Sequence, residues 1–235
     1  MRHSRPLAAL VTVVVAIALG VNLRESGAAV QSKPPAATGQ RQGPVISAAA
    51  RNPRTVALTF DDGPSPYTPQ ILAVLRRNHV QATFCMLGAQ AKRYPRLARQ
   101  VVREGHQLCD HSRDHRNMAR LSKAKARAEV ADGQREIHAV TGVTPKIFRF
   151  PYGSSDAQSR KLVTGFHLRR LGWDIDPQDW RRPPARQITA RIVRHAHPRA
   201  VVLMHDGGGD RSHTAASLDA TIKQLRKHGY RFVLA

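Results

Sequence analysis

Short apolar runs alternate with amphipathic stretches along most of the chain. The first run, residues 55–60, is rich in β-branched side chains and ends at two adjacent carboxylates, after which Gly63 and Pro64 prevent the strand from continuing. Runs of the same kind predict further strands at residues 82–86, 107–110, 146–150, 166–173, 200–204 and 230–234.

Helical stretches are expected between these strands. Residues 68–78 open with Pro69 in the first turn and place Ile71 and Leu75 four residues apart on an apolar stripe. Further helices are expected from Pro95 to Gly105 and at residues 122–141, 156–164, 187–196 and 214–228. This alternation predicts a parallel α/β domain, although periodicity alone does not separate an open sheet from a barrel.

Polar clusters follow several of the predicted strands. Asp61 and Asp62 repel each other, which raises one pKa unless a cation or a basic partner compensates. A bare Asp-Asp-Gly is also an ordinary polar turn, but His111 and His115 follow a second strand and His205 follows a third. Asp62 and the first two histidines supply three N/O ligands, as in a catalytic zinc-type site. Their spacing predicts that His111 and His115 face the same side of one helical turn.

From about Thr55 to its C-terminus, the sequence resembles the polysaccharide deacetylases with a NodB-like domain. The resemblance implies a metal-dependent enzyme that removes acetyl groups from sugar polymers. It also implies a distorted (β/α) barrel of about seven strands. It rests on five motifs in the family's order, at residues 59–64 (Thr-Phe-Asp-Asp-Gly-Pro), 111–115 (His-Ser-Arg-Asp-His), 149–153 (Arg-Phe-Pro-Tyr-Gly), 176–180 (Asp-Pro-Gln-Asp-Trp) and 203–206 (Leu-Met-His-Asp).

The resemblance implies separate roles for the two adjacent carboxylates. Asp62 would bind the metal with the two histidines, while Asp61 would act as the catalytic base. Alternation along an extended chain would point their side chains in different directions. Arg149 would hold Asp61 ionised through a bidentate contact. The ligand set suits Zn²⁺, and Co²⁺ or Ni²⁺ also fit.

A second group of residues would complete the reaction. His205 is the candidate acid for the leaving group. The resemblance implies that Asp179 orients and charges the imidazole, with Asp174 and Asp176 as nearby rivals. The backbone N–H of Tyr152 would bind the oxyanion, because the preceding proline has no N–H to offer.

Two apolar side chains would hold the substrate. Trp180 and Leu203 are expected to form a notch for the acetyl methyl group, although both also suit ordinary core packing. The glycine-rich residues 207–212 lack the Gly-Lys-Ser/Thr of a P-loop. This stretch is similar to loops of exported bacterial members of the family, and we expect it to form a flexible rim of the substrate groove.

The chain is strongly basic. It carries 38 Lys and Arg against 16 Asp and Glu, for a formal net charge of +22. Such a charge favours polyanions, including anionic cell-wall polymers, although an arginine-rich composition alone also produces it. Only 5% of residues are aromatic, and no nucleic-acid recognition motif is present, so nucleic acid is not an expected partner.

The N-terminus predicts export. Residues 1–29 combine a basic start, an uncharged apolar run and small residues, as in a signal peptide or an uncleaved N-terminal anchor. Residues 30–53 are rich in Gln, Pro, Ala and Gly and predict a disordered linker. The deacetylase domain would then cover residues 54–235. We expect a monomeric domain that is secreted or associated with the cell envelope, with the N-terminal segment as its only membrane contact.

Cys85 and Cys109 are the two cysteines of the chain. Both lie in predicted strands that would be neighbours in one sheet, so a disulfide is favoured over two buried thiols in an exported protein.

The sequence therefore predicts an exported hydrolase. Its most favoured substrate is the N-acetyl group of N-acetylglucosamine in peptidoglycan or chitin-type oligomers. An O-acetyl esterase acting on xylan is the alternative within the class. A non-catalytic glycan-binding domain is the alternative outside it, and that class would predict the loss of Asp61 or His205, which are both present.

Overall fold

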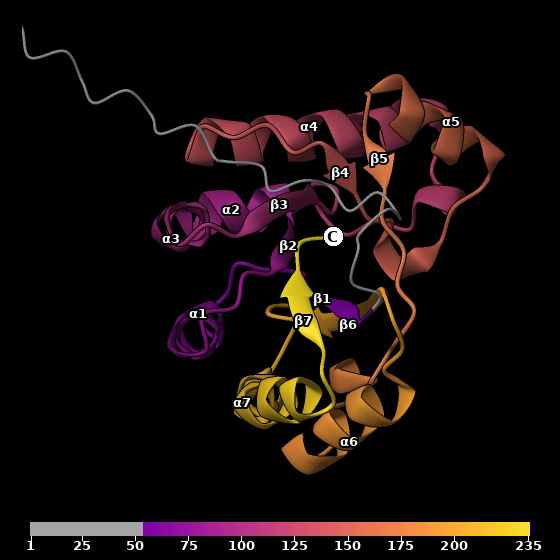
Figure 1. Ribbon diagram of the computed structural model, residues 1–235. Helices are drawn as coiled ribbons and strands as arrows, with labels where there is room; N and C mark the ends of the chain where they lie inside the picture. Colours follow the sequence, from indigo (N-terminus) through magenta and orange to yellow (C-terminus); the bar gives the residue numbers. More distant parts are fainter. Residues whose placement is uncertain (1–53) are drawn as a thin grey trace, which may run out of the picture. The chain divides into compact units, whose positions relative to one another are not determined.

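The computed structural model describes residues 54–235, and the predicted signal segment (1–29) and linker (30–53) lie outside the described residues. Strands and helices alternate along the described part (Figure 1). The strands are β1 Thr55–Asp61, β2 Thr83–Met86, β3 Gln107–Asp110, β4 Ile147–Phe148, β5 Arg169–Arg170, β6 Ala200–His205 and β7 Arg231–Val233. The α-helices are α1 Thr68–Arg77, α2 Gly88–Arg93, α3 Pro95–Arg103, α4 Lys123–Thr141, α5 Ala157–Gly165, α6 Ala185–His195 and α7 Ser212–Lys227. Short 3₁₀ turns are η1 Met118–Arg120, η2 Pro151–Gly153 and η3 Asp179–Arg181.

The strands form one parallel sheet in the order β5-β4-β3-β2-β1-β6, and β7 also pairs with β1. Two strands pair with the same edge of β1: β7 pairs with its first residues, and β2 pairs with its last residues. The chain leaving β5 then crosses to the far side of the sheet, where Leu203 on β6 donates a 2.9 Å hydrogen bond to the carbonyl of Ile175. This crossing closes the curved sheet into the expected distorted (β/α) barrel.

The same crossing explains why the strand predicted at residues 166–173 is much shorter in the structure. Residues 166–173 are apolar enough to suggest a full strand, but only Arg169 and Arg170 pair with β4. The chain must leave β4 at this point to reach β6, where Ile175 forms an isolated bridge with Val202. Alternation of side chains carries no information about such a change of partner.

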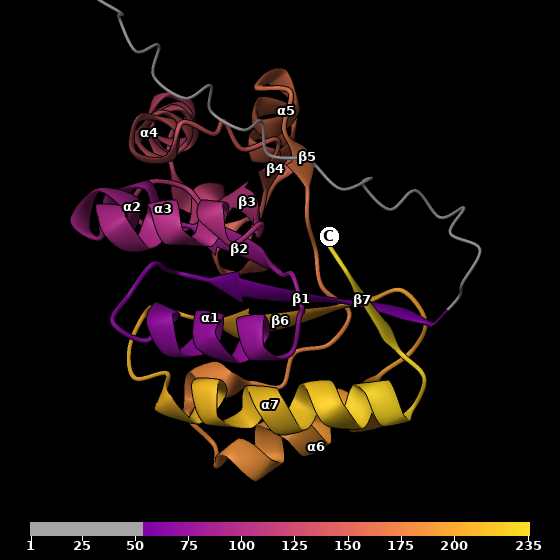
Figure 2. The same ribbon diagram turned by 60° about the vertical axis from the view of Figure 1, so that its left-hand side comes forward.

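The two faces of the sheet differ in chemistry. On β1, Leu58 and Phe60 belong to the main hydrophobic cluster, and the Phe60 ring stacks on Phe84 at 5.1 Å. Each such buried side chain contributes roughly 2 kcal/mol. The alternate residues Thr59 and Asp61 instead bind polar groups on the opposite face. In Figure 2, α1, α6 and α7 lie on one side of β1, and α2 and α3 lie beside β2 and β3.

One helix was not predicted. Gly88 suggested a strand break and nothing more, yet it begins α2. A Cβ atom at this position would lie 2.8 Å from the Cα of Gly133 on α4, so the two helices approach closely at their glycines. No helix within residues 54–235 has the length and apolar character needed to cross a bilayer.

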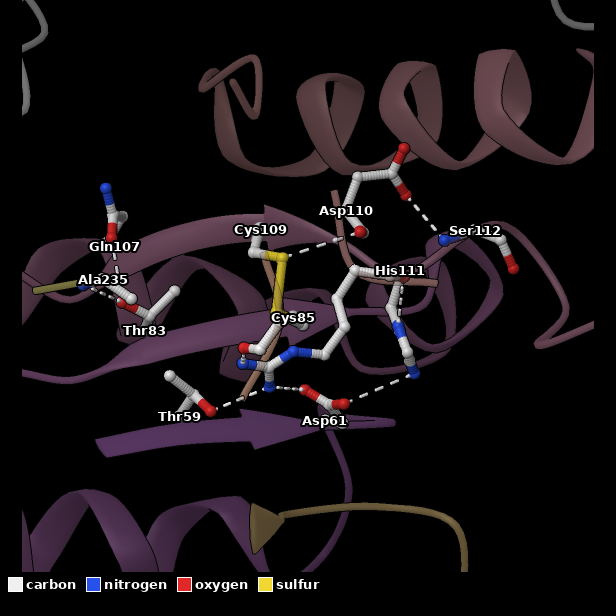
Figure 3. Close-up of a disulfide and its surroundings, with 12 residues drawn as sticks. Thr59, Asp61, Thr83, Cys85, Gln107, Cys109, Asp110, His111, Ser112 and Ala235 are labelled. Atoms are coloured by element: carbon white, nitrogen blue, oxygen red, sulfur yellow. Dashed lines mark hydrogen bonds and ion pairs between the residues drawn. A yellow bond between two sulfur atoms is a disulfide. The ribbon is translucent and has the colours of Figure 1, made fainter. Parts of the chain in front are cut away.

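The structure joins Cys85 to Cys109 by a disulfide (Figure 3). The two residues face each other directly across β2 and β3, with their Cα atoms 4.1 Å apart. Both side chains are fully buried and pack with Ile147. In register, Cys85 is also the neighbour of Asp61 on β1. The disulfide therefore lies directly beside the strand end that carries the adjacent carboxylates.

We expect the double substitution Cys85→Ala/Cys109→Ala to lower the free energy of unfolding by about 3 kcal/mol, because the bridge closes a loop with a sequence separation of 24. Urea unfolding of the variant and of the oxidised protein measures this difference. Thiol titration of the unfolded, unreduced protein provides the control, and two free thiols would contradict the bridge.

Candidate active site

A cleft of about 630 Å³ opens at the carboxyl ends of the strands. Eight of the residues predicted from the sequence line it: Asp61, Asp62, His111, His115, Tyr152, Trp180, Leu203 and His205. The other two, Arg149 and Asp179, are fully buried and reach the site by contact with Asp61 and His205. The five motifs, far apart in the sequence, therefore meet at one place.

The turn after β1 separates the two adjacent carboxylates. Asp61 is the last residue of the strand, and Asp62 adopts a left-handed backbone conformation with φ of 72°. The backbone N–H groups of Asp206 and Gly207 donate to the Asp61 carbonyl at 3.0 and 3.2 Å. The predicted divergence of the two side chains is present, but a left-handed turn produces it where we expected an extended chain.

Asp62 forms a compact group with the two histidines. Its Oδ1 lies 3.3 Å from Nε2 of His115 and 3.6 Å from Nε2 of His111. One ligand atom of each of the three residues lies within 4.8 Å of the others. Oδ1 is buried and accepts no hydrogen bond from residues 54–235. A buried carboxylate oxygen without a donor is costly, so the group fits a bound cation.

His111 is oriented as a metal-binding histidine usually is. The Nδ1 atom of His111 lies 2.7 Å from the backbone carbonyl oxygen of Arg149. A proton on Nδ1 would satisfy this contact and leave the Nε2 lone pair facing Asp62. Burial, partly opposed by the charge of Asp62, lowers the pKa of His115, which favours the neutral imidazole that metals bind.

The predicted helical turn between His111 and His115 is wrong. Residues 111–117 form a loop, in which Ser112 and His115 have φ values of 72° and 60°. The loop is held by side chains: Asp110 accepts from the Ser112 N–H at 2.9 Å (Figure 3), and Ser112 Oγ accepts from the His115 N–H at 3.1 Å. Two left-handed residues therefore bring the imidazoles together without helical periodicity.

Asp61 is held by a fully buried arginine. Nη1 of Arg149 donates to Asp61 Oδ1 at 2.7 Å, and the other oxygen, Oδ2, lies 3.6 Å from His111 Nε2. Burial alone would raise the pKa of Asp61, but Arg149, His111 and His205 outweigh it and hold the pKa below its usual value. The carboxylate is therefore ionised near neutral pH, as a base requires.

The predicted bidentate contact is not formed. Arg149 Nη1 also donates to Thr59 Oγ1 at 2.8 Å, and Nη2 donates to the carbonyl of Gly172 at 2.9 Å. The guanidinium thus donates to three different acceptors, because Thr59 and Gly172 also lie within hydrogen-bonding distance.

His205 and Asp179 form the second half of the site. Nδ1 of His205 lies 2.7 Å from Asp179 Oδ1, while Asp179 Oδ2 accepts from the His205 N–H and from Thr214 Oγ1. Burial lowers the pKa of His205, but the hydrogen bond and charge of Asp179 outweigh it and raise the pKa to about 9. The two rivals bind backbone instead: Asp174 accepts from the N–H of residue 201, and Asp176 accepts from that of residue 178.

The predicted substrate-binding residues lie at the cleft. Tyr152 has a left-handed backbone with φ of 59°, and its exposed ring packs edge-on against His115 at 4.4 Å between centroids. The Trp180 side chain is exposed beneath the guanidinium of Arg181, whereas Leu203 is buried in the floor. Two exposed aromatic side chains therefore line the cleft.

Three further residues at the site received no role of their own from the sequence. Trp173 lines the cleft and packs so closely on Gly153 that a Cβ there would lie 2.7 Å away, but in the sequence it is only the last residue of a predicted strand. Asp206 is buried behind Asp62, and burial, partly opposed by Thr68, raises its pKa to about 7. Arg211 belongs to the predicted rim, where it lines the cleft and is itself buried.

Comparisons with known proteins agree with this geometry. The family model described as polysaccharide deacetylase matches residues 48–170. A peptidoglycan-N-acetylglucosamine deacetylase of Bacillus cereus is 38% identical over 185 residues, which cover 77% of this chain and 86% of the relative. A chitooligosaccharide deacetylase of Bradyrhizobium is 38% identical over 180 residues, which cover 73% of this chain and 81% of the relative.

A solved structure adds the fold. A CE4 family pseudoenzyme from Bacillus anthracis superposes with a TM-score of 0.73 at 32% identity. The match covers 78% of this chain and 64% of that protein, so this chain spans slightly less than two thirds of its length. Sequence motifs, barrel and site geometry all lead to one assignment, and the chain belongs to the polysaccharide deacetylase family.

Proposed function

We propose that the protein is an exported, metal-dependent hydrolase that removes N-acetyl groups from N-acetylglucosamine units of a glycan, in peptidoglycan or chitin-type oligomers. One observation carries the proposal. An ionised Asp61 lies beside a three-residue ligand cluster, and the His205–Asp179 pair lines the same cleft. The names of the relatives from Bacillus cereus and Bradyrhizobium support this type of substrate.

Asp62, His111 and His115 would hold the metal. Two imidazoles and one carboxylate favour Zn²⁺, with Co²⁺ or Ni²⁺ as alternatives. When bound, such a cation polarises the substrate carbonyl and makes a neighbouring water easier to deprotonate. The protein contributes the rest of the chemistry through its own side chains.

Asp61 would take the proton from the attacking water. Arg149 and the surrounding positive groups keep its carboxylate ionised for this task. His205 would then donate a proton to the leaving amine nitrogen as the C–N bond breaks, because Asp179 keeps the imidazole protonated. The base and the acid are therefore opposite in charge at the same pH.

Three other residues would position the acetyl group. The backbone N–H of Tyr152 follows Pro151 and would donate to the oxyanion that forms on the carbonyl oxygen. Trp180 and Leu203 would enclose the acetyl methyl group, since both line the cleft close to His205. Such an enclosure would favour acetyl esters and amides over larger acyl groups.

Two alternative functions are compatible with the same geometry. An O-acetyl esterase for xylan would use the same base and acid, because ester and amide hydrolysis share the oxyanion. A non-catalytic glycan-binding protein is the other, since a pseudoenzyme shares this fold. The paired contacts of both Asp61 and His205 favour catalysis over binding alone.

We also propose that the protein works outside the cytoplasm. The composition of residues 1–29 is that of an export signal or anchor. The disulfide suits an oxidising compartment. The net charge of +22 would favour anionic cell-wall polymers over nucleic acid as additional partners.

Acetate release from three substrates tests the function. We expect release from acetylated chito-oligosaccharides or peptidoglycan fragments, loss of release with a chelator, and recovery on adding Zn²⁺. Release from acetylated xylan alone would favour the esterase. Glycan binding without acetate release from any substrate would favour the non-catalytic alternative.

The substitution Asp179→Asn should lower kcat/KM by about 100-fold and move the alkaline limb of its pH profile to lower pH. Asp179 raises the pKa of His205 to about 9, so its loss deprotonates the acid at a lower pH. Asp174→Asn is the matched control, because Asp174 binds only backbone. An unmoved alkaline limb in the Asp179 variant would rule out this role.

A further inference from the structure

A glycine loop, residues 207–211, connects β6 to α7 and is braced by its own last residue. The Arg211 side chain is only 4% exposed. Its Nε donates to the carbonyl of Gly207 at 2.6 Å, and its Nη2 donates to the carbonyl of Gly208 at 3.0 Å. A buried guanidinium that binds two successive carbonyls fixes the path of the loop between them. This is a more ordered arrangement than the flexible rim that the sequence predicts.

The braced part of the loop lies directly against the ligand Asp62. A Cβ atom at Gly207 would lie 2.2 Å from the Asp62 carbonyl oxygen. A Cβ atom at Gly208 would lie 2.4 Å from Asp62 Oδ2. The loop backbone therefore forms a wall behind the carboxylate, whose other oxygen, Oδ1, faces the histidines. Moving the loop would free the carboxylate to turn away from them.

The same segment also reaches the acid side of the site. Arg211 immediately precedes α7, and its carbonyl accepts from the N–H of Ala215 at 2.9 Å. One residue before Ala215, Thr214 donates from Oγ1 to Asp179 at 2.8 Å. The segment from the glycine loop to Thr214 thus contacts both the ligand and the acid pair.

We propose that Arg211 is a positioning residue for the metal site. By holding Gly207 and Gly208 in place, it restricts the Asp62 carboxylate to the orientation that faces both imidazoles, and it acts on the metal through that carboxylate. The proposal rests on the proposed function only in taking Asp62, His111 and His115 as the ligands. Loss of an outer contact of this kind commonly lowers metal affinity 10- to 100-fold.

Two other roles are compatible with part of the geometry. Arg211 lines the cleft, so it is also placed to contact a glycan. It is buried, so it also contributes to folding. Its donors to the loop carbonyls favour the positioning role, because those contacts engage Nε and Nη2 with the two glycines that lie against Asp62.

The test is the dissociation constant for Zn²⁺, measured by competition with a chromophoric chelator on the full-length protein. We expect Arg211→Ala to raise it at least 10-fold, and Arg211→Lys to give an intermediate value, since lysine cannot bind both carbonyls at once. Arg186→Ala, on the exposed part of α6, is the matched control and should bind Zn²⁺ like the wild type. Should Arg211→Ala fail to fold, Arg211→Lys carries the test by itself, because it keeps the positive charge and loses the paired donors to the two carbonyls.

A double-mutant cycle identifies the route of the effect. The effect of Arg211→Ala should vanish in an Asp62→Asn background and persist in a His115→Ala background. Unchanged Zn²⁺ affinity with a lower melting temperature would reduce Arg211 to a folding role. Unchanged affinity with a raised KM would assign it to the glycan. Either result would overturn the inference and leave the proposed function standing, whereas a wild type that binds no Zn²⁺ would overturn both.

Discussion

The turn at the end of β1 is the constraint on which the site depends. Two carboxylates stand side by side in the sequence, and a left-handed Asp62 sends them to different partners. A non-glycine residue in this conformation costs roughly 1–2 kcal/mol. Two N–H groups from the end of β6 hold the Asp61 carbonyl and offset that cost. Asp61 is thereby held by a buried arginine, and Asp62 lies against both imidazoles, while His111 Nε2 lies 3.6 Å from an oxygen of each carboxylate.

Burial inside the barrel stabilises the different placement of the Asp61 and Asp62 side chains. Arg149 is fully buried, so it needs Asp61 as its counter-charge, and removing either partner would leave an uncompensated charge inside the protein. The carbonyl of Arg149 also lies 2.7 Å from His111 Nδ1, so one residue links Asp61 to the proposed ligand cluster. The disulfide lies beside this group, between β2 and β3. Covalent, ionic and hydrogen-bonded constraints therefore meet at the carboxyl ends of three adjacent strands.

Much of this could be predicted from the sequence, because the information was local. The strand before Asp61, the paired histidines and the motif around Arg149 each stand next to a clear apolar run. The errors arose where the chain departs from regular periods. Ser112 and His115 have left-handed backbone conformations where a helical turn was predicted. After β5, the chain stops pairing with β4 and continues beside β6. Arg211 was missed for a related reason, since a glycine-rich stretch shows no sign of the buried side chain that orders it.

The proposed mechanism requires different roles for Asp61 and Asp62. The most direct test compares Asp61→Asn with Asp62→Asn, measuring the Zn²⁺ dissociation constant and the turnover of an acetylated chito-oligosaccharide for each. Asp61→Asn should keep wild-type zinc affinity while turnover falls by about 10²–10⁴-fold. Asp62→Asn should still bind zinc, but measurably more weakly than the wild type. Equal loss of zinc in both variants, or substantial turnover in Asp61→Asn, would contradict the division of roles at the end of β1.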